Sequence, residues 1–313
     1  MYIIGDIGNT EVKIYVYSTK KKLAKKIILK SNLINNKYLK KNLSFILKKK
    51  IILNKAIFSS VVPKIFRLIK IFLLKNLKLK CFEIKQLNIN KLIKILVNRK
   101  QIGSDRLCNA IGVNDKKNNY IIVDFGTATT FDVINKNKYL GGIIAPGVSL
   151  SLSTLISKAS LIPSLKLKKI KNILGKNTIS AVRSGFYWGY IGLVENIIDK
   201  ISKQTKKKYK VILTGGYSHL FIKSIRQKIF IDKDITIKGL LKINKLSFLS
   251  TIKPGSAYIK SIPGKLSSAN VTPTSTIIHF CEPGFPYAYK FMFMPISPDP
   301  PSGQNINSSF III

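Results

Sequence analysis

Residues 2–10 read Tyr-Ile-Ile-Gly-Asp-Ile-Gly-Asn-Thr, and residues 120–130 read Tyr-Ile-Ile-Val-Asp-Phe-Gly-Thr-Ala-Thr-Thr. Each stretch is an apolar run, typical of a buried β-strand, that ends in an aspartate and a glycine-containing turn. The glycine lets the backbone turn close to a ligand, and turn amides and hydroxyls can hold phosphate. One such turn alone fits an ordinary β-hairpin equally well. Two copies separated by the length of a domain predict two related lobes that bind one nucleotide between them.

The length and composition fit a folded protein of roughly two domains. The chain has 313 residues, of which 46% are hydrophobic, enough for a sizeable core. We find no run of about 18 uncharged apolar residues, so we expect no membrane-spanning helix, and no signal peptide is apparent. Cys81, Cys108 and Cys281 lack the spacing of a metal site and are odd in number. These features predict a cytoplasmic protein in a reducing compartment.

The net charge of +41 raises the question of nucleic-acid binding. Lysine supplies nearly all of this charge, the lysines are spread along the chain, and isoleucine and asparagine are abundant too. An AT-rich genome over-supplies these three residues, so we favour biased codon usage and expect only nonspecific attraction to nucleic acid. Acids are correspondingly scarce, which makes those beside glycine turns candidates for chemistry.

The apolar pattern predicts strands followed by helices, and then the same order again, as in two α/β lobes. In the first half we expect a hairpin over residues 1–19, helical structure over 20–50, strands at 56–62 and 79–84, a helix from Pro63 to Leu77, and a helix from Gly103 with Ser104 or Asp105 as its N-cap. In the second half we expect hairpin strands at 120–124 and 129–134, a strand and turn at 141–147, helices at 149–159 and 178–203, a strand at 210–213 and a closing segment at 235–241. We place the lobes at residues 1–117 and 118–245.

The composition changes after about Lys245. Residues 246–313 hold nine of the 12 prolines, only four lysines and no arginine. We interpret them as a Pro/Ser-rich tail outside the folded core, either a disordered extension or a product of read-through or mis-joined coding sequence. A small third domain is the less favoured alternative.

Six motifs in this chain together resemble those of the type III pantothenate kinase family, a branch of the acetate and sugar kinase/actin superfamily. They are Asp6–Thr10, Gly103–Arg106, Asp124–Thr129, Gly141–Gly147, Gly175–Thr178 and Thr214–Gly216, and they cover about residues 1–245. Each motif is weak alone, but the ordered set is specific. The resemblance implies an α/β fold of two RNase H-like, actin-like ATPase lobes with a nucleotide cleft between them. It also implies a homodimer that phosphorylates pantothenate with ATP to 4′-phosphopantothenate, the first step of coenzyme A biosynthesis.

The first phosphate loop is predicted at residues 6–13. Phosphoryl transfer needs Mg²⁺ to neutralise the triphosphate, and Asp6 can hold that ion through water. ATP contacts are expected from Asp6 and from the turn that follows it, formed by Ile7, Gly8, Asn9 and Thr10, and from Lys13. The alternative for Lys13 is a solvated lysine on a strand.

The acceptor site is predicted at Gly103, Ser104, Asp105 and Arg106. A kinase needs a base near the attacking hydroxyl, and Asp105 can fill that role. Arg106 offers a planar fork for the carboxylate that pantothenate carries. The alternative is a helix cap followed by a surface arginine. Family members often have a tyrosine and a proline just before this motif, and residues 96–102 contain neither, which leaves the fine shape of the pocket open.

The resemblance assigns further roles to single residues. It implies that Asp124 binds a monovalent cation, K⁺ or NH₄⁺, that Thr127 contacts ATP, and that Thr178 contacts pantothenate, possibly across the dimer interface. Helix capping is the alternative for Thr178. For Asp132 we favour a turn or edge-strand acid without a role in the site.

Other classes of site and function are weighed against this one. The chain lacks a Gly-x-x-x-x-Gly-Lys-Ser/Thr loop, so it is not a P-loop kinase, and no His/Cys cluster supports zinc. Residues 141–147 either shape the substrate pocket or form a plain turn, and the apolar residues 186–194 either form a dimer interface or pack in the core. The open functional alternatives are a related kinase for another small hydroxyl substrate, a basic nucleic-acid-binding accessory protein, and an inactive copy.

Overall fold

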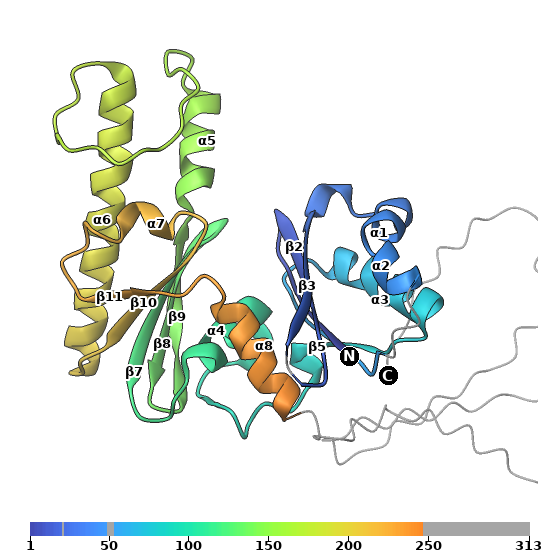
Figure 1. Ribbon diagram of the computed structural model, residues 1–313. Coiled ribbons are helices and arrows are strands. Elements are labelled where there is room, and N and C mark those ends of the chain that lie inside the picture. Colours follow the sequence, from blue (N-terminus) through green and yellow to red (C-terminus); the bar gives the residue numbers. More distant parts are fainter. Residues whose placement is uncertain (21, 49–52, 247–313) are drawn as a thin grey trace, which may run out of the picture. The chain divides into compact units, whose positions relative to one another are not determined.

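The computed structural model describes residues 1–20, 22–48 and 53–246 (Figure 1). The first sheet has five strands in the order β3-β2-β1-β4-β5. They are β1 (Tyr2–Ile7), β2 (Glu11–Tyr17), β3 (Leu23–Lys30), β4 (Ala56–Ser60) and β5 (Cys81–Glu83). β1 and β2 form the predicted antiparallel hairpin, and β1 runs parallel to β4.

The second sheet repeats this topology. Its six strands follow the order β11-β10-β7-β8-β9-β6, and they are β6 (Lys94–Ile95), β7 (Asn119–Phe125), β8 (Ala128–Asn135), β9 (Lys138–Pro146), β10 (Lys210–Gly215) and β11 (Ile229–Ile231). The run β9-β8-β7-β10-β11 has the same sequence of antiparallel and parallel neighbours as β3-β2-β1-β4-β5. This repeat confirms the prediction of two α/β lobes of one type.

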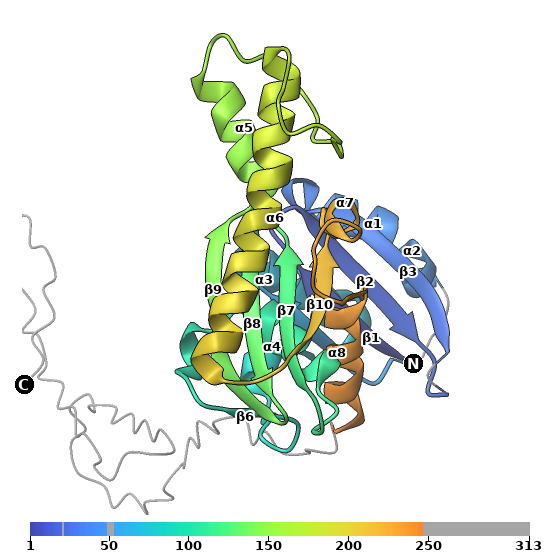
Figure 2. The same cartoon turned by 90° about the vertical axis from the view of Figure 1, so that its left-hand side faces the viewer.

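Helices cover both sheets. The described α-helices are α1 (Asn36–Asn42), α2 (Ser44–Lys48), α3 (Pro63–Leu77), α4 (Ser104–Val113), α5 (Val148–Lys158), α6 (Thr178–Thr205), α7 (Ser218–Phe221) and α8 (Ile235–Lys245), with 3₁₀ turns at Ser31–Leu33, Ile84–Gln86 and Arg99–Gln101. As predicted, α3 begins with a proline in its first turn. The long α6 lies along one face of the second sheet (Figure 2) and shares a core with β7, β8 and β10. Its N-terminal part and α5 extend beyond the strand ends (Figures 1 and 2).

Helices α4 and α8 pack together between the two sheets. One hydrophobic core contains residues of β1 and β4, of α4 and α8, and of β7, β8 and β10. The two helices approach so closely that a Cβ atom on Gly239 would lie 2.0 Å from the Cys108 carbonyl oxygen, and one on Gly112 would lie 2.4 Å from the Ile235 carbonyl oxygen. The Lys242 ammonium donates to the carbonyl oxygens of Gly112, at 2.9 Å, and Asn114, at 2.8 Å. Because the last carbonyls of a helix lack partners within it, these bonds fix the C-terminal end of α4 to α8.

One secondary-structure prediction is wrong. Residues 23–30, expected to be helical, form β3, while α1 and α2 supply the helical structure expected further along. Along β3 only Ile27 and Leu29 are buried, two residues apart, as in a strand with one face against the core. The lysines of β3 are exposed on an edge strand, where lysine discourages pairing with another sheet. Abundant lysine obscured this two-residue period in the sequence.

Two further expectations concern the end of the chain and membranes. The closing segment predicted at 235–241 is α8, which packs against both sheets. The predicted tail, residues 246–313, lies outside the described residues apart from Leu246. Among the helices that the structure describes, none combines the length and apolar character needed to cross a membrane.

Candidate active site

Asp6 lies near the end of β1, the middle strand of the first sheet. In the strand register it neighbours Lys13 of β2 and Ser59 of β4. Its carboxyl pKa is raised to about 6, chiefly by burial and next by the negative charge of Asp105. Asp6 is therefore a partly buried acid at the point where the first predicted phosphate loop begins.

The loop itself is the tight turn of the β1–β2 hairpin. The backbone N–H of Gly8 donates to the Glu11 carbonyl oxygen at 2.9 Å, and Asn9 and Thr10 are exposed beyond it. Lys13 is partly exposed, and its ammonium lies 4.0 Å from the Glu11 carboxylate. An exposed ion pair of this length is weak, so Lys13 is free to meet an anionic ligand at this turn.

Asp105 lies in the first turn of α4. The helix N-cap is Gly103, without a side-chain cap bond, so the prediction of Ser104 or Asp105 as N-cap is wrong. Asp105 Oδ1 instead accepts a hydrogen bond from the Arg106 backbone N–H at 2.8 Å. A Cβ atom on Gly103 would lie only 2.4 Å from that oxygen, which explains the glycine. Burial raises the pKa of the Asp105 carboxyl.

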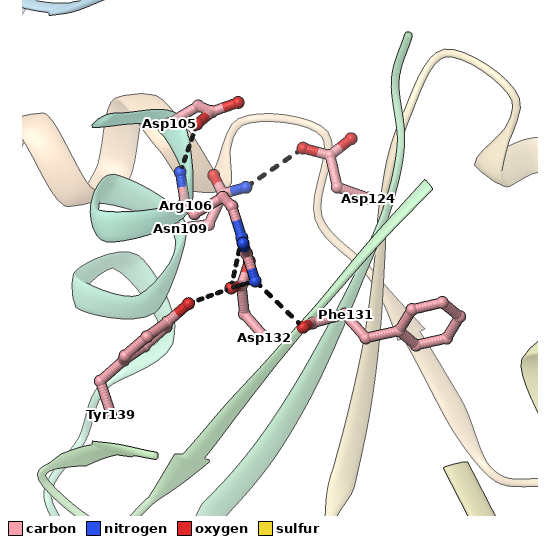
Figure 3. Close-up of polar contacts among 7 residues, drawn as sticks. All are labelled: Asp105, Arg106, Asn109, Asp124, Phe131, Asp132 and Tyr139. Carbon is pink, nitrogen blue, oxygen red and sulfur yellow. Dashed lines mark hydrogen bonds and ion pairs between the residues drawn. The ribbon is translucent and has the colours of Figure 1, made fainter. Parts of the chain in front are cut away.

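Asp124 lies near the end of β7 and is held by a residue that the sequence did not single out. Asn109 of α4 is fully buried, and its Nδ2 donates to Asp124 Oδ2 at 3.2 Å (Figure 3). Asp124 Oδ1 faces Gly215, where a Cβ atom would come within 2.5 Å. The pKa of Asp124 is raised to about 7, first by burial and next by Asp105.

Three predicted site residues from three separate elements are near enough to influence one another electrostatically: Asp6 from β1, Asp105 from α4 and Asp124 from β7. Each repels its neighbours electrostatically, and burial removes the water that would screen them. A positive charge among these carboxylates would relieve this repulsion, and oxygen ligands suit hard cations. The arrangement is suited to an anionic substrate that arrives with cations.

Asp132 is not the turn or edge-strand acid that we favoured. It lies inside β8, which has strands on both sides, and its side chain is fully buried. Its Oδ1 accepts from Arg106 Nε at 2.8 Å and from the Tyr139 hydroxyl at 2.6 Å, and Arg106 Nη2 lies 2.8 Å away (Figure 3). The pKa of Asp132 is raised to about 6, because burial outweighs the opposing charge of Arg106. Arg106 is thus part of a buried network, not a surface arginine.

The Gly141-Gly142 doublet belongs to this network. Gly141 has φ +133, a conformation that favours glycine. A Cβ atom on Gly142 would lie 2.0 Å from the Phe131 carbonyl oxygen and 2.2 Å from Arg106 Nη2. The guanidinium therefore lies directly over the Gly142 backbone. Residues 141–146 are therefore the end of strand β9, beside Arg106, and not a plain turn. Their part in shaping the substrate pocket stays a prediction.

Thr127 and Thr178 lie at different places. Thr127 is exposed in the β7–β8 turn, and its carbonyl oxygen would come within 2.0 Å of a Cβ atom on Gly147. Thr178 is the exposed first residue of α6, after the N-cap Asn177, which accepts from the Ser180 backbone N–H at 2.9 Å. The capping role belongs to Asn177. Within the described residues, no hydrogen bond or ion pair links Thr178 to Asp105, Arg106 or Asp124.

Sequence reasoning missed Asn109 and Tyr139 and undervalued Asp132. One signal was present: Asn109 follows Asp105 by four residues, so the two share a helix face. Asp132 and Tyr139 gave no comparable signal, because their meeting depends on the β8–β9 register and on α4 packing over it.

Comparisons with known proteins agree on one family. A family model described as "Type III pantothenate kinase" matches residues 2–200. The chain is 56% identical over 246 residues to a type III pantothenate kinase of Pelagibacter ubique (strain HTCC1062), covering 79% of this chain and 99% of that protein. It is 40% identical over 205 residues to a type III pantothenate kinase of Sulfurihydrogenibium sp. (strain YO3AOP1), covering 62% of this chain and 77% of that protein.

A solved structure supports the fold independently of close sequence similarity. It is a protein from Sinorhizobium meliloti proposed to be a 2-dehydro-3-deoxygalactonokinase, with a TM-score of 0.53 and 8% identity, over 79% of this chain and 99% of that one. At this identity the match concerns the fold alone. It supports the predicted α/β fold with two sheets.

Proposed function

We infer the role of each site residue from one premise, that the chain belongs to the type III pantothenate kinase family. It accordingly transfers a phosphoryl group from ATP to pantothenate, giving 4′-phosphopantothenate, the first step of coenzyme A biosynthesis. The observation that carries the assignment of roles is that α4, which bears Asp105 in its first turn, also holds Asp124 of β7 through Asn109. We place the protein in the cytoplasm, where its nucleotide substrate is made.

Asp105 is proposed as the general base. The primary hydroxyl of pantothenate loses its proton to the Asp105 carboxylate as its oxygen bonds to the γ-phosphorus, and the bond to ADP breaks in line. The hydrogen bond from the Arg106 N–H fixes Oδ1, which leaves Oδ2 for the incoming hydroxyl. Burial raises the pKa of this carboxyl and so strengthens it as a proton acceptor.

Asp6 and Asp124 fit the two cations expected for this reaction. The mutual repulsion of the three carboxyls favours positive charge here. We assign Mg²⁺ to Asp6 through water, and a monovalent cation, K⁺ or NH₄⁺, to Asp124. When bound, such cations neutralise the phosphates of ATP and the charge that develops on them. The chain's own part is to hold the carboxylates in place through Asn109 and the strand ends.

The phosphate contacts are assigned to the two hairpin turns. The amides and side chains of Ile7, Gly8, Asn9, Thr10 and Lys13 on one side and Thr127 on the other are proposed to hold ATP. Both turns are exposed, as a site for an exchanging nucleotide requires, and both follow one of the converging acids. The lobes at 1–117 and 118–245 remain our proposed division, with α4 and α8 as the helices that both share.

Arg106 is proposed to bind the carboxylate of pantothenate with only some of its guanidinium N–H donors. Nε and Nη2 are already held by Asp132, so the remaining donor, Nη1, is the one available to substrate. Gly103 and Ser104 form the adjoining backbone, and the Ser104 hydroxyl is buried without a hydrogen-bond partner among the described residues. An unpartnered buried hydroxyl is costly, and a bound substrate would satisfy it.

Dimerisation is proposed through α6. The residues we considered as an interface, Tyr190 and Val194 among them, instead pack in the core. The face beside them carries Gly185, Gly189 and Gly192, all exposed, where a Cβ atom would meet nothing within 4 Å. Their spacing of four and three places them on one side of the helix. A second copy of this helix would fit closely there, which would bring Thr178 to the partner's substrate site.

Gly189→Glu is expected to separate the two copies, because it places a bulky charge at the centre of this glycine face. Light scattering should give the wild type twice the 35.1 kDa of the chain and the variant one chain mass. Lys203→Glu, an exposed change on the same helix, is the matched control and should stay dimeric. A monomeric wild type, or a dimeric Gly189→Glu, contradicts the proposed interface.

The assigned roles are tested first by ATP turnover of the full chain. ADP release should require pantothenate and should fall when K⁺ is replaced by Na⁺ at equal ionic strength. Equal turnover with K⁺ and with Na⁺ would contradict the assignment of a monovalent cation to Asp124. A folded protein without pantothenate-dependent turnover would contradict the assigned activity.

A further inference from the structure

A buried hydrogen-bonded chain runs from α8 through α4 to β7. The Thr236 hydroxyl of α8 donates to Asn109 Oδ1 of α4 at 2.7 Å. Asn109 Nδ2 then donates to Asp124 Oδ2 of β7 at 3.2 Å. Asn109 is fully buried, so it has no water to replace either partner.

The chemistry of the three groups fixes the direction of this chain. An ionised carboxylate only accepts hydrogen bonds, so the amide nitrogen of Asn109 has to face Asp124. The amide oxygen then faces Thr236, whose hydroxyl can donate to it. Without that donor the amide loses the contact that holds it in this orientation, and its flipped form would set oxygen against oxygen at Asp124.

The result is a carboxylate with two different oxygens. Oδ2 of Asp124 is held by Asn109, whereas Oδ1 lies close to the backbone of Gly215, which has φ +85 and where a Cβ atom would come within 2.5 Å of that oxygen. One oxygen is thus held by a side-chain amide, while the other lies against glycine backbone at the end of β10. Asn109 also lies one helical turn after Asp105, so the anchor for Asp124 and the proposed base belong to one rigid helix.

We propose that Asn109, oriented by Thr236, is a positioning residue that presents Asp124 to the monovalent cation. This rests on the proposed assignment of that cation to Asp124. α8, which carries none of the assigned site residues, then contributes to K⁺ affinity. α8 also packs on the first sheet. Binding of the cation by Asp124, in the second lobe, therefore depends on a helix that contacts the first lobe as well.

The test compares Thr236→Val, which removes the hydroxyl at nearly constant shape, with Thr236→Ser, which keeps it. The probe is K⁺, titrated against choline at constant ionic strength, and the readouts are the K⁺ concentrations for half-maximal thermal stabilisation and for half-maximal turnover. A net hydrogen bond of about 0.5–1.5 kcal/mol corresponds to a shift of about 2- to 10-fold. We expect Thr236→Val to raise both concentrations by this factor, with kcat at saturating K⁺ and the pantothenate KM nearly unchanged, and Thr236→Ser to match the wild type.

Other outcomes overturn the inference. Three results would show that Thr236 has only a packing role. They are equal K⁺ titrations for Thr236→Val and the wild type, equal shifts for the Val and Ser variants, and a lower kcat at saturating K⁺ with unchanged K⁺ affinity. Should Thr236→Val fold poorly, Thr236→Ala is titrated by turnover at low temperature against the same criteria. A wild type that turns over pantothenate without a K⁺ response defeats the inference alone, whereas K⁺ stabilisation without turnover leaves it standing and defeats the assigned activity.

Discussion

Asp105→Asn is expected to lower kcat by about 10²- to 10⁴-fold, the usual contribution of a general base. The amide has the size of the carboxylate and can still accept from the Arg106 N–H, but it cannot take the proton of the pantothenate hydroxyl. The pantothenate KM should change much less, because the groups assigned to binding remain. Steady-state kinetics at saturating ATP, Mg²⁺ and K⁺ measure both constants.

The pH profile gives a second view of the same residue. Burial raises the pKa of Asp105, and only its ionised form accepts a proton, so kcat/KM should fall with decreasing pH sooner than an exposed aspartate would cause. Asp199→Asn is the matched control: Asp199 is a half-exposed acid on α6 whose carboxylate accepts from Gln227 Nε2 at 3.0 Å and lies 3.6 Å from Arg226. Its replacement should leave kcat within about twofold, because an exposed ion pair contributes little. A variant Asp105→Asn with more than a tenth of the wild-type kcat would rule Asp105 out as the base.

Gly239→Ala is expected to destabilise the protein and to lower kcat, although alanine normally stabilises a helix by about 1 kcal/mol relative to glycine. The new methyl carbon would lie 2.0 Å from the Cys108 carbonyl oxygen, so α8 and α4 must move apart. Overpacking of this kind costs about 1–3 kcal/mol. Because α4 carries Asp105, a displacement of about 1 Å should also cost up to about 10²-fold in kcat.

Urea unfolding and steady-state kinetics of the same preparations measure the two effects. Gly216→Ala is the control for stability, since a Cβ atom there meets nothing within 4 Å. Its free energy of unfolding should stay within about 0.5 kcal/mol of the wild type. A Gly239→Ala protein of full stability and activity would mean that the close α4–α8 crossing is not required.

The sequence predicted the parts of this fold that local patterns encode. The strands of both central hairpins stand out because apolar runs end at Asp6-x-Gly8 and Asp124-x-Gly126, and α3 begins where Pro63 indicates. β3 was missed because its exposed positions hold apolar residues such as Leu23 and Ile28 as well as lysines, so the buried Ile27 and Leu29 do not stand out as an alternating pattern.

The site was predictable where chemistry and motif coincide, and not where packing decides. Asp6, Asp105 and Asp124 could be named from their turns. The position of Asp132 inside β8, and its bond to Arg106, follow from strand order and from the placement of α4 against β8. The glycine at position 142 was visible, but its reason, a guanidinium lying over it, required the structure.

The hydrogen bonds from Lys242 to the end of α4 can form only late in the synthesis of the chain. Lys242 is separated from Gly112 by 130 residues, so the helix that carries the base is made long before the segment that secures it. All six recognisable motifs have been synthesised by residue 216, yet a chain stalled or cut there would lack α8 and with it part of the core. Such a fragment would contain every motif of the family but would lack the helix that secures α4, which carries the proposed base.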